Sequence, residues 1–242
     1  MKLPGSLHDE LALGQRKLIA AFGSSVPHIL KAGEIPLETT RLGDEILHLR
    51  TGWACQFPDI ISGRRTIVDV YLPGDVIGLD TLLGNRPLTN VLVLTSATAQ
   101  AIPPHRLVEL MADRSTALFI AWLLGQRQRR ADRLLAAISG LDARGRVASM
   151  MLDFHRRLRR RRLITGVTYS LPLSQVQIGQ YLGLTVVHVN RVLRSLRAER
   201  ILELEKHCVT IIDLDRLSSV VENHATKSLN TSVSDSLAEV AN

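Results

Sequence analysis

The stretch LSQVQIGQYLGLTVVHVNRVLRSL, residues 173–196, decides the fold of the C-terminal part of the chain. Ser174 is placed to cap a first helix, and Gln177 three residues later completes a capping box. Gly183 ends that helix, because glycine accepts the positive φ that a tight turn requires. Thr185 then caps a second helix with its hydroxyl group. The sequence therefore predicts two short helices joined by a tight turn.

The predicted second helix separates an apolar face from a polar face. The predicted buried face consists of side chains at helical spacing, namely Val189, Val192, Leu193 and Leu196. Successive residues of an α-helix are rotated by about 100°, so Arg191 and Arg194 point away from this buried face. In a helix-turn-helix that binds DNA, the N-terminal part of the second helix enters the major groove. The pattern therefore favours a DNA-binding helix-turn-helix over an ordinary helical hairpin with a polar face.

Residue chemistry suggests a role for each outward side chain. Arg191 can donate two hydrogen bonds to guanine, and Asn190 can pair with adenine. Val187 can contact a thymine methyl group, His188 a base or a phosphate, and Arg194 a phosphate. The residues predicted to bind DNA are Ser174, Gln175, Thr185, Val187, His188, Asn190, Arg191 and Arg194.

The segment after the second helix predicts a small β-hairpin. Residues 200–212 form two apolar runs around Glu205-Lys206-His207. A hairpin in this place is a wing, which commonly contacts DNA phosphates. Residues 142–221 therefore predict a winged helix.

Positive charge is concentrated in the same part of the chain. The net charge is +7, and residues 142–221 hold 14 basic against 7 acidic residues. A localised basic excess is typical of proteins that bind a phosphate backbone. The run 156–162 contains six arginines. Two interpretations of that run stay open: a solvated helix end, or a contact with flanking DNA phosphates.

The N-terminal part shows a different pattern, because residues 24–102 alternate apolar and polar positions between turns. This predicts several short strands in a small β-barrel or sandwich. The clearest strand runs are 45–50, 65–71 and 91–94. The turn signals are Thr51-Gly52, Ser62-Gly63 and Pro73-Gly74-Asp75.

A long helix is predicted over residues 116–139, after a helical start near Pro104. Apolar residues in it recur at alternating spacings of four and three, which is typical of a coiled-coil dimer seam. The alternative is a helix that packs only on its own barrel. The predicted dimer seam consists of Ala117, Ala121, Leu124, Gln128, Ala131, Leu135 and Ile138.

Composition narrows the function classes. No apolar run approaches the ~18 residues of a membrane span, and no signal-peptide core follows Met1. We therefore expect a cytoplasmic protein that does not enter a membrane. The two cysteines, Cys55 and Cys208, do not form a metal motif. No residue set has catalytic spacing, so we expect neither an enzyme nor a metal site.

The order of motifs resembles the Crp/Fnr family of bacterial transcription regulators. Thr51-Gly52-Trp53, Gly63–Val68 and Leu72–Gly78 resemble its β-roll sensor, and Leu141–Arg146 resembles its hinge. Gly183–Arg191 resembles the recognition helix of a subgroup with Val-His-Val-Asn-Arg. The resemblance implies a homodimer on a palindromic DNA operator, with a winged helix moved by a sensor domain. It also implies RNA polymerase as a partner.

Pattern and resemblance together predict an α+β chain with a cyclic-nucleotide-binding-like β-roll, a dimerisation helix and a winged helix. The expected boundaries are 1–114 for the β-roll with an N-terminal helix, 115–141 for the dimerisation helix, 142–221 for the DNA-binding domain and 222–242 for a disordered tail. The alternative function is a cyclic-nucleotide-type module that controls a partner protein. Such a module has no need of residues 173–212.

The sequence does not identify the effector that the sensor domain would bind. Cyclic-AMP-binding members of the family carry a Glu after the cassette glycine and an Arg-Ser or Arg-Thr pair. Here Gly78 is followed by Leu79 and Asp80, and Arg86 is the nearest arginine, so the pattern disfavours cyclic AMP. These four residues are the candidate effector pocket. A third hypothesis is a degenerate sensor that acts constitutively.

Other sensing chemistries have weaker support. An iron–sulfur cluster is disfavoured, because the N-terminal segment has no cysteine cluster. Redox sensing by Cys208 or Cys55 requires an exposed thiol of low pKa, which favours Cys208 in the wing beside Lys206 and His207. Haem binding stays open as a minor hypothesis, with an axial ligand among His28, His48, His105 and His155.

Overall fold

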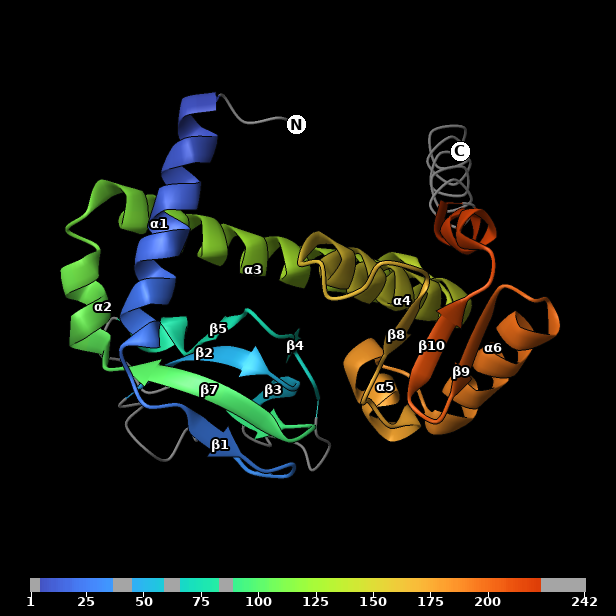
Figure 1. The fold of residues 1–242 in the computed structure, drawn as a ribbon. Helices are drawn as coiled ribbons and strands as arrows, with labels where there is room; N and C mark the ends of the chain where they lie inside the picture. The colour runs from blue at the N-terminus through green and yellow to red at the C-terminus, as the bar shows by residue number, and fades with distance from the viewer. Residues whose placement is uncertain (1–4, 37–44, 59–65, 83–88, 223–242) are drawn as a thin grey trace, which may run out of the picture. The chain divides into compact units, whose positions relative to one another are not determined.

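The computed structural model describes residues 5–36, 45–58, 66–82 and 89–222 of the 242-residue chain. The chain divides into two compact units, residues 1–131 and 132–242 (Figure 1). The turn at Ser62-Gly63, Arg86 of the candidate effector pocket, and tail residues 223–242 lie outside the described residues. The domain boundaries expected from the sequence stay predictions.

The first unit contains two antiparallel sheets. The strand order is β1-β7-β2-β5 in one sheet and β4-β3-β6 in the other. The first sheet consists of β1 (His28–Leu30), β7 (Ala97–Ile102), β2 (Ile46–Thr51) and β5 (Val76–Ile77). The second consists of β4 (Asp69–Tyr71), β3 (Ala54–Pro58) and β6 (Thr89–Val93). Strands were thus predicted in the right places, although β4 is shorter than the run 65–71.

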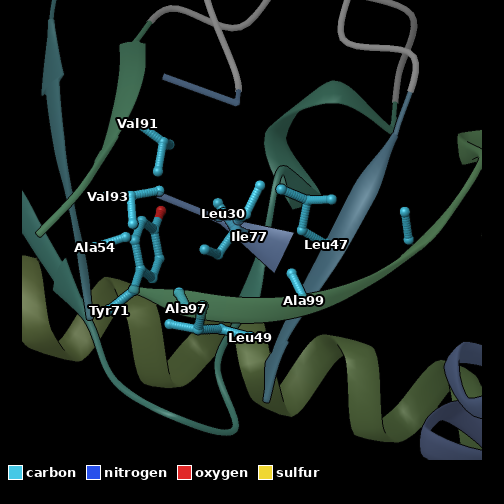
Figure 2. Close-up of a cluster of buried hydrophobic side chains, with 11 residues drawn as sticks. Leu30, Leu47, Leu49, Ala54, Tyr71, Ile77, Val91, Val93, Ala97 and Ala99 are labelled. Atoms are coloured by element: carbon cyan, nitrogen blue, oxygen red, sulfur yellow. The ribbon is translucent and has the colours of Figure 1, made fainter. Parts of the chain in front are cut away.

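Side chains from both sheets form one apolar core, shown in Figure 2. Leu47 and Leu49 come from the first sheet, and Tyr71, Val91 and Val93 from the second. Leu47 and Leu49 are two residues apart, as are Val91 and Val93, so that each pair faces the same side of its strand. Ile46 and His48 between and beside them are buried as well, so the other face of β2 is also covered.

Three helices pack beside the sheets, and their apolar side chains form a second core. They are α1 (Gly5–Gly23), α2 (Pro104–Leu110) and the first part of α3 (Arg114–Gly140). Phe22 on α1, Leu107 on α2 and Ile120 on α3 are each buried in that core. A Cβ atom on Gly14 would lie 2.0 Å from the Ser115 carbonyl oxygen. Glycine therefore permits the close approach of α1 to α3.

The second unit combines three helices with a three-stranded sheet of order β8-β10-β9. Its helices are α4 (Ala143–Arg160), α5 (Gln175–Leu182) and α6 (Val186–Ala198), followed at the end by helical residues 214–222. Its strands are β8 (Thr168–Ser170), β9 (Leu202–Glu205) and β10 (Cys208–Ile211). The predicted α+β fold class, with an N-terminal β domain and a C-terminal helix-turn-helix, is confirmed.

In the described ranges, no helix is both long and apolar enough to cross a membrane. No group of three or more His, Cys, Asp or Glu side chains in these ranges is arranged to hold a metal ion.

Candidate nucleic-acid interface

Helix α5 begins with the predicted capping box. The Ser174 hydroxyl accepts a hydrogen bond from the Gln177 backbone N–H at 3.2 Å, and the Gln177 side-chain oxygen accepts one from the Ser174 N–H at 2.8 Å. Ile178, Tyr181 and Leu182 are buried. The predicted start of this helix is confirmed, and the three buried side chains form its inward face.

The turn between α5 and α6 depends on two glycines. Gly183 has a φ of 66°, as predicted for the helix end. Gly179 accepts a hydrogen bond from the Leu184 N–H at 2.9 Å, and a Cβ atom on Gly179 would lie 2.6 Å from the Leu184 carbonyl oxygen. The sequence analysis missed Gly179. Its only signal there is a glycine placed inside a predicted helix.

Helix α6 is capped by Thr185, whose hydroxyl accepts a hydrogen bond from the His188 N–H at 3.3 Å. Val189, Val192 and Leu196 are buried as predicted, whereas Leu193 is half-buried. This burial fixes the rotation of α6 about its axis and so determines which side chains face outward.

The outward face of α6 carries most of the predicted DNA-binding side chains. Val187 is 75% exposed, although it is apolar, and it lies in the first turn. His188, Arg191 and Arg194 are also exposed, while Asn190 is half-buried. The structure thus places a row of outward polar side chains and one apolar side chain on one helix.

An ion pair joins α4 to the end of α6. Arg144 Nη2 donates to Glu199 Oε2 at 2.7 Å, and its Nη1 donates to Ser195 Oγ at 3.1 Å. The hydrogen bonds from Arg144 and then Ser195 lower the pKa of Glu199 to about 2. This pair positions α6, and the sequence analysis did not single it out because its members lie far apart in the chain.

A second arginine of α4 reaches the helix-turn-helix. Arg146 Nε donates to the Leu141 carbonyl at 2.8 Å, and its Nη1 donates to the Leu182 carbonyl at 3.3 Å. Leu182 is the last residue of α5. Positive charge at a helix C-terminus is favourable, because the carbonyl groups there carry partial negative charge.

The wing is present as predicted, with β9 and β10 paired antiparallel around Lys206 and His207. Both turn residues have positive φ, 46° and 64°. A two-residue hairpin turn of this kind matches the twist of the strands. Strand β8 pairs with the other edge of β10 and was missed, because three residues are too few for a clear alternation.

The arginine run at the end of α4 divides between two environments. Arg157 is buried, with its guanidinium carbon 5.7 Å from the centre of the Phe154 ring and its Nη1 3.7 Å from Asp153. Arg156, Arg159 and Arg160 are exposed. A single role for the whole run is therefore wrong, since Arg157 belongs to the packing of its own domain.

The candidate effector residues lie at the start of a short 3-10 helix, Leu79–Thr81, in the first unit. Gly78 has a φ of 88°, and Leu79 is buried in the apolar core with Phe22 and Ile120. Asp80 Oδ1 accepts a hydrogen bond from Arg127 at 3.3 Å. A ligand role for these residues stays a prediction.

Helix α3 makes further polar contacts with the strands of the first unit. Arg127 Nη2 donates to Gln56 Oε1 at 2.8 Å, and the Tyr71 hydroxyl donates to the same oxygen at 2.7 Å. Arg130 forms an ion pair with Asp69 at 2.8 Å, with both side chains largely buried. Burial, and then the charge of Asp69, raise the pKa of Tyr71.

The predicted dimer seam lies on an uncovered stripe of α3. Leu124 and Leu135 are exposed, Leu135 by 65%. Ala121, Gln128 and Ala131 are exposed as well. Ala117 and Ile138, at the two ends of the seam, are half-buried.

The candidate sensing side chains lie in contrasting environments. Cys55 is buried and Cys208 is exposed, as the redox hypothesis expected. His155 is buried, with Nε2 3.1 Å from the Gly166 carbonyl oxygen. His48 is buried beside Phe22, while His28 and His105 are exposed. Haem and redox roles stay predictions.

The helix-turn-helix, the wing and the preceding helix match a known family model over residues 145–220. That model is the Crp-like helix-turn-helix domain, and the matched residues 145–220 are called the Crp-like domain below. The Crp-like domain therefore includes α5, α6, β9 and β10 and nearly all of α4. The subgroup suggested by Val-His-Val-Asn-Arg stays a prediction.

Similarity extends beyond the Crp-like domain. The chain is 26% identical over 166 residues to the transcriptional regulatory protein btr of Bordetella pertussis, an alignment that covers 66% of each protein. The alignment thus spans slightly less than two thirds of that relative.

Solved structures share the fold. The chain resembles FixK2 from Bradyrhizobium japonicum with a TM-score of 0.74 and 23% identity, over 81% of this chain and 96% of that one. A CRP/FNR family transcriptional regulator from Thermus thermophilus gives a TM-score of 0.61 and 17% identity, over 82% and 100%. At these identities, the likenesses show a shared fold.

Proposed function

We propose that this protein is a transcription regulator that binds specific DNA sequences through the Crp-like domain. One observation carries the proposal: the outward face of α6 presents Val187, Arg191 and Arg194 to solvent, just after a capped helix start. The relatives named above include a transcriptional regulatory protein, which agrees with this role.

Within α6, Arg191 and Asn190 are proposed to contact bases. Arginine matches the two acceptors of guanine, and asparagine matches the acceptor and donor of adenine. Val187 offers a methyl contact to thymine. His188 is proposed for a base or a phosphate contact, near the start of the helix.

Other side chains are proposed to position the domain on the phosphate backbone. Arg194, one turn further along α6, and the wing residues Lys206 and His207 are exposed. Ser174, Gln175 and Thr185 lie at the N-terminal ends of α5 and α6, where backbone N–H groups favour phosphate. Such contacts set affinity and salt dependence rather than sequence preference.

We propose a homodimer on a palindromic operator. The exposed apolar stripe of α3, with Leu124 and Leu135, is the proposed dimer seam. Two-fold symmetry would place two α6 helices in successive major grooves, about one helical turn of DNA apart. RNA polymerase is a proposed further partner, through the resemblance alone.

The β-roll of the first unit is proposed to be the sensor domain. It either responds to an effector or is a degenerate sensor, in which case the protein acts constitutively. The alternative function, a cyclic-nucleotide-type module that acts on a partner protein, is not favoured. It does not account for the exposed polar side chains of α6. No observation on the described residues selects an effector.

Selection from a random duplex library tests the proposal. The purified full-length chain should enrich a two-fold symmetric sequence, with half-sites about 10 base pairs apart. The Arg191→Ala variant is the matched control and should enrich no such sequence. Recovery of random DNA by the unaltered chain would contradict the proposed function.

A further inference from the structure

A pocket of about 400 Å³ lies within the second unit, between α4 and the helical residues 214–222. None of the residues of α5 and α6 that are proposed to bind DNA lines this pocket. Leu152 and Leu214 give the pocket apolar lining, and Ser218 contributes a hydroxyl group. The remaining lining residues are His155, Arg156, Arg159 and Arg160.

The charge of this groove indicates an acidic occupant. Arg156, Arg159 and Arg160 are exposed, and within the described residues no ion pair joins any of their guanidinium groups to a carboxylate. Three such cations around an apolar base suit a segment that carries both carboxylates and apolar side chains.

The position of the groove separates it from the start of the helix-turn-helix. Figure 1 shows the helical residues 214–222 at the opposite end of the second unit from α5. A protein segment therefore fits the groove better than the DNA that α5 and α6 are proposed to bind.

The chain itself provides a segment of this chemistry. After Lys227 the sequence has two carboxylates, Asp235 and Glu239, and no basic residue. Val233, Leu237 and Val240 follow at spacings of four and three, the pattern of one helix face. The charge and the apolar pattern are thus complementary to the groove.

Connectivity also favours this segment. Ser218 lines the groove and lies only four residues before Glu222, the last described residue. Nine residues separate Glu222 from Ser232, and an extended chain spans at most about 3.3–3.6 Å per residue. The segment 232–240 is therefore within reach of the groove in the same chain.

We propose that the acidic C-terminal segment of this chain, residues 232–240, docks into the groove lined by Arg156, Arg159 and Arg160. Asp235 and Glu239 pair with the arginines, and Leu237 contacts Leu152 and Leu214. This intramolecular contact does not depend on the proposed DNA-binding function.

The test uses a fluorescent peptide of residues 223–242 and two proteins: the full-length chain and a chain shortened to end at Glu222. Fluorescence anisotropy should show binding to the shortened chain, weakened by added salt. Binding to the full-length chain should be about tenfold weaker, because its own tail competes at high effective concentration. Absence of binding to the shortened chain would overturn the proposal.

A variant of the shortened chain with substitutions in the groove tests whether the peptide binds there. In the shortened chain, Arg156→Ala, Arg159→Ala and Arg160→Ala together should weaken peptide binding about tenfold. The control combines Arg191→Ala and Arg194→Ala on α6 and should leave peptide binding unchanged. All three groove side chains are exposed, so thermal unfolding should confirm that this variant is folded.

Variants of the peptide test the two kinds of contact separately. Asp235→Asn with Glu239→Gln should remove the salt dependence, and Leu237→Ala should weaken binding at every salt concentration. Equal peptide binding by the groove variant and the unaltered chain would overturn the proposal. A groove variant that loses DNA affinity but keeps peptide binding would assign the arginines to phosphate contacts instead.

Discussion

Arg144 on α4 and Glu199 at the end of α6 form a two-pronged ion pair, in which Nη2 donates to Oε2 at 2.7 Å and Nη1 donates to Oε1. Ser195 on α6 donates to the same carboxylate at 2.9 Å. The helix that presents the outward arginines is thereby held against α4 by charge as well as by its buried valines.

The pair predicts a pH-dependent contribution to stability. The folded-state pKa of Glu199 is lowered to about 2, from 4.5, by Arg144 and Ser195. A carboxylate with a lowered pKa stabilises the fold above its unfolded pKa and loses that effect as pH falls through its folded pKa. Glu199→Gln should therefore lower the urea midpoint at pH 7, and the difference should disappear between pH 4.5 and about 2.

Glu205→Gln is the control for that experiment, since Glu205 of the wing forms an exposed ion pair with Arg197 of α6. Exposed pairs contribute little, so its midpoint should stay near that of the unaltered chain. An effect of Glu199→Gln that is the same at pH 7 and at pH 2 would contradict the assigned role of the charge.

Arg191→Ala should abolish operator preference and leave weak, salt-sensitive DNA binding. The guanidinium group lies on the outward face of α6, where a bidentate contact to guanine contributes about 1–3 kcal/mol of discrimination. Competition between operator and random DNA in a mobility-shift assay measures this. Arg194→Ala is the comparison and should weaken both DNAs equally, because a phosphate contact carries no sequence information. If Arg191→Ala weakens binding to operator DNA and to random DNA equally, Arg191 does not contact a base.

Gly179→Ala should destabilise the second unit and reduce DNA binding. The added Cβ would meet the Leu184 carbonyl oxygen at 2.6 Å, so the turn must shift. Overpacking of this kind costs about 1–3 kcal/mol, which should exceed the roughly 1 kcal/mol gained in helix propensity. Chemical denaturation followed by DNA titration measures both effects.

Gly166→Ala is the matched control for Gly179→Ala. Among the described residues, no heavy atom lies within 4 Å of the place that its Cβ would occupy. Its unfolding free energy and DNA affinity should remain close to those of the unaltered chain. If both variants are equally stable, the close approach at Gly179 is unimportant.

Leu135→Lys should convert the proposed dimer into a monomer. Leu135 is 65% exposed in the single chain, and a lysine there would place a charge inside the seam of α3. Light scattering after size-exclusion chromatography gives the mass. Ala136→Lys adds the same charge at an exposed position outside the seam and should leave the mass unchanged. A dimer that persists with Leu135→Lys would place the two-fold contact elsewhere.

Local signals in the sequence were sufficient for the elements that carry the proposed DNA contacts. Capping by Ser174 and Thr185, the turn at Gly183 and the wing turn at Lys206-His207 depend on residues within a few positions of one another. Such short-range hydrogen bonds and backbone preferences are visible in a linear chain. The periodicities of two and 3.6 likewise separated the β domain from the helical parts.

Tertiary structure alone decided the relationships between distant residues. Arg144 meets Glu199 and Arg130 meets Asp69 only after the chain has folded. The same folding buries Arg157 and leaves its neighbours Arg156 and Arg159 exposed. The sequence by itself determined which segments form helices, strands and caps, because those depend on local backbone chemistry. Packing decided which side chains of those segments face one another, because burial and charge pairing depend on positions that the linear chain does not specify.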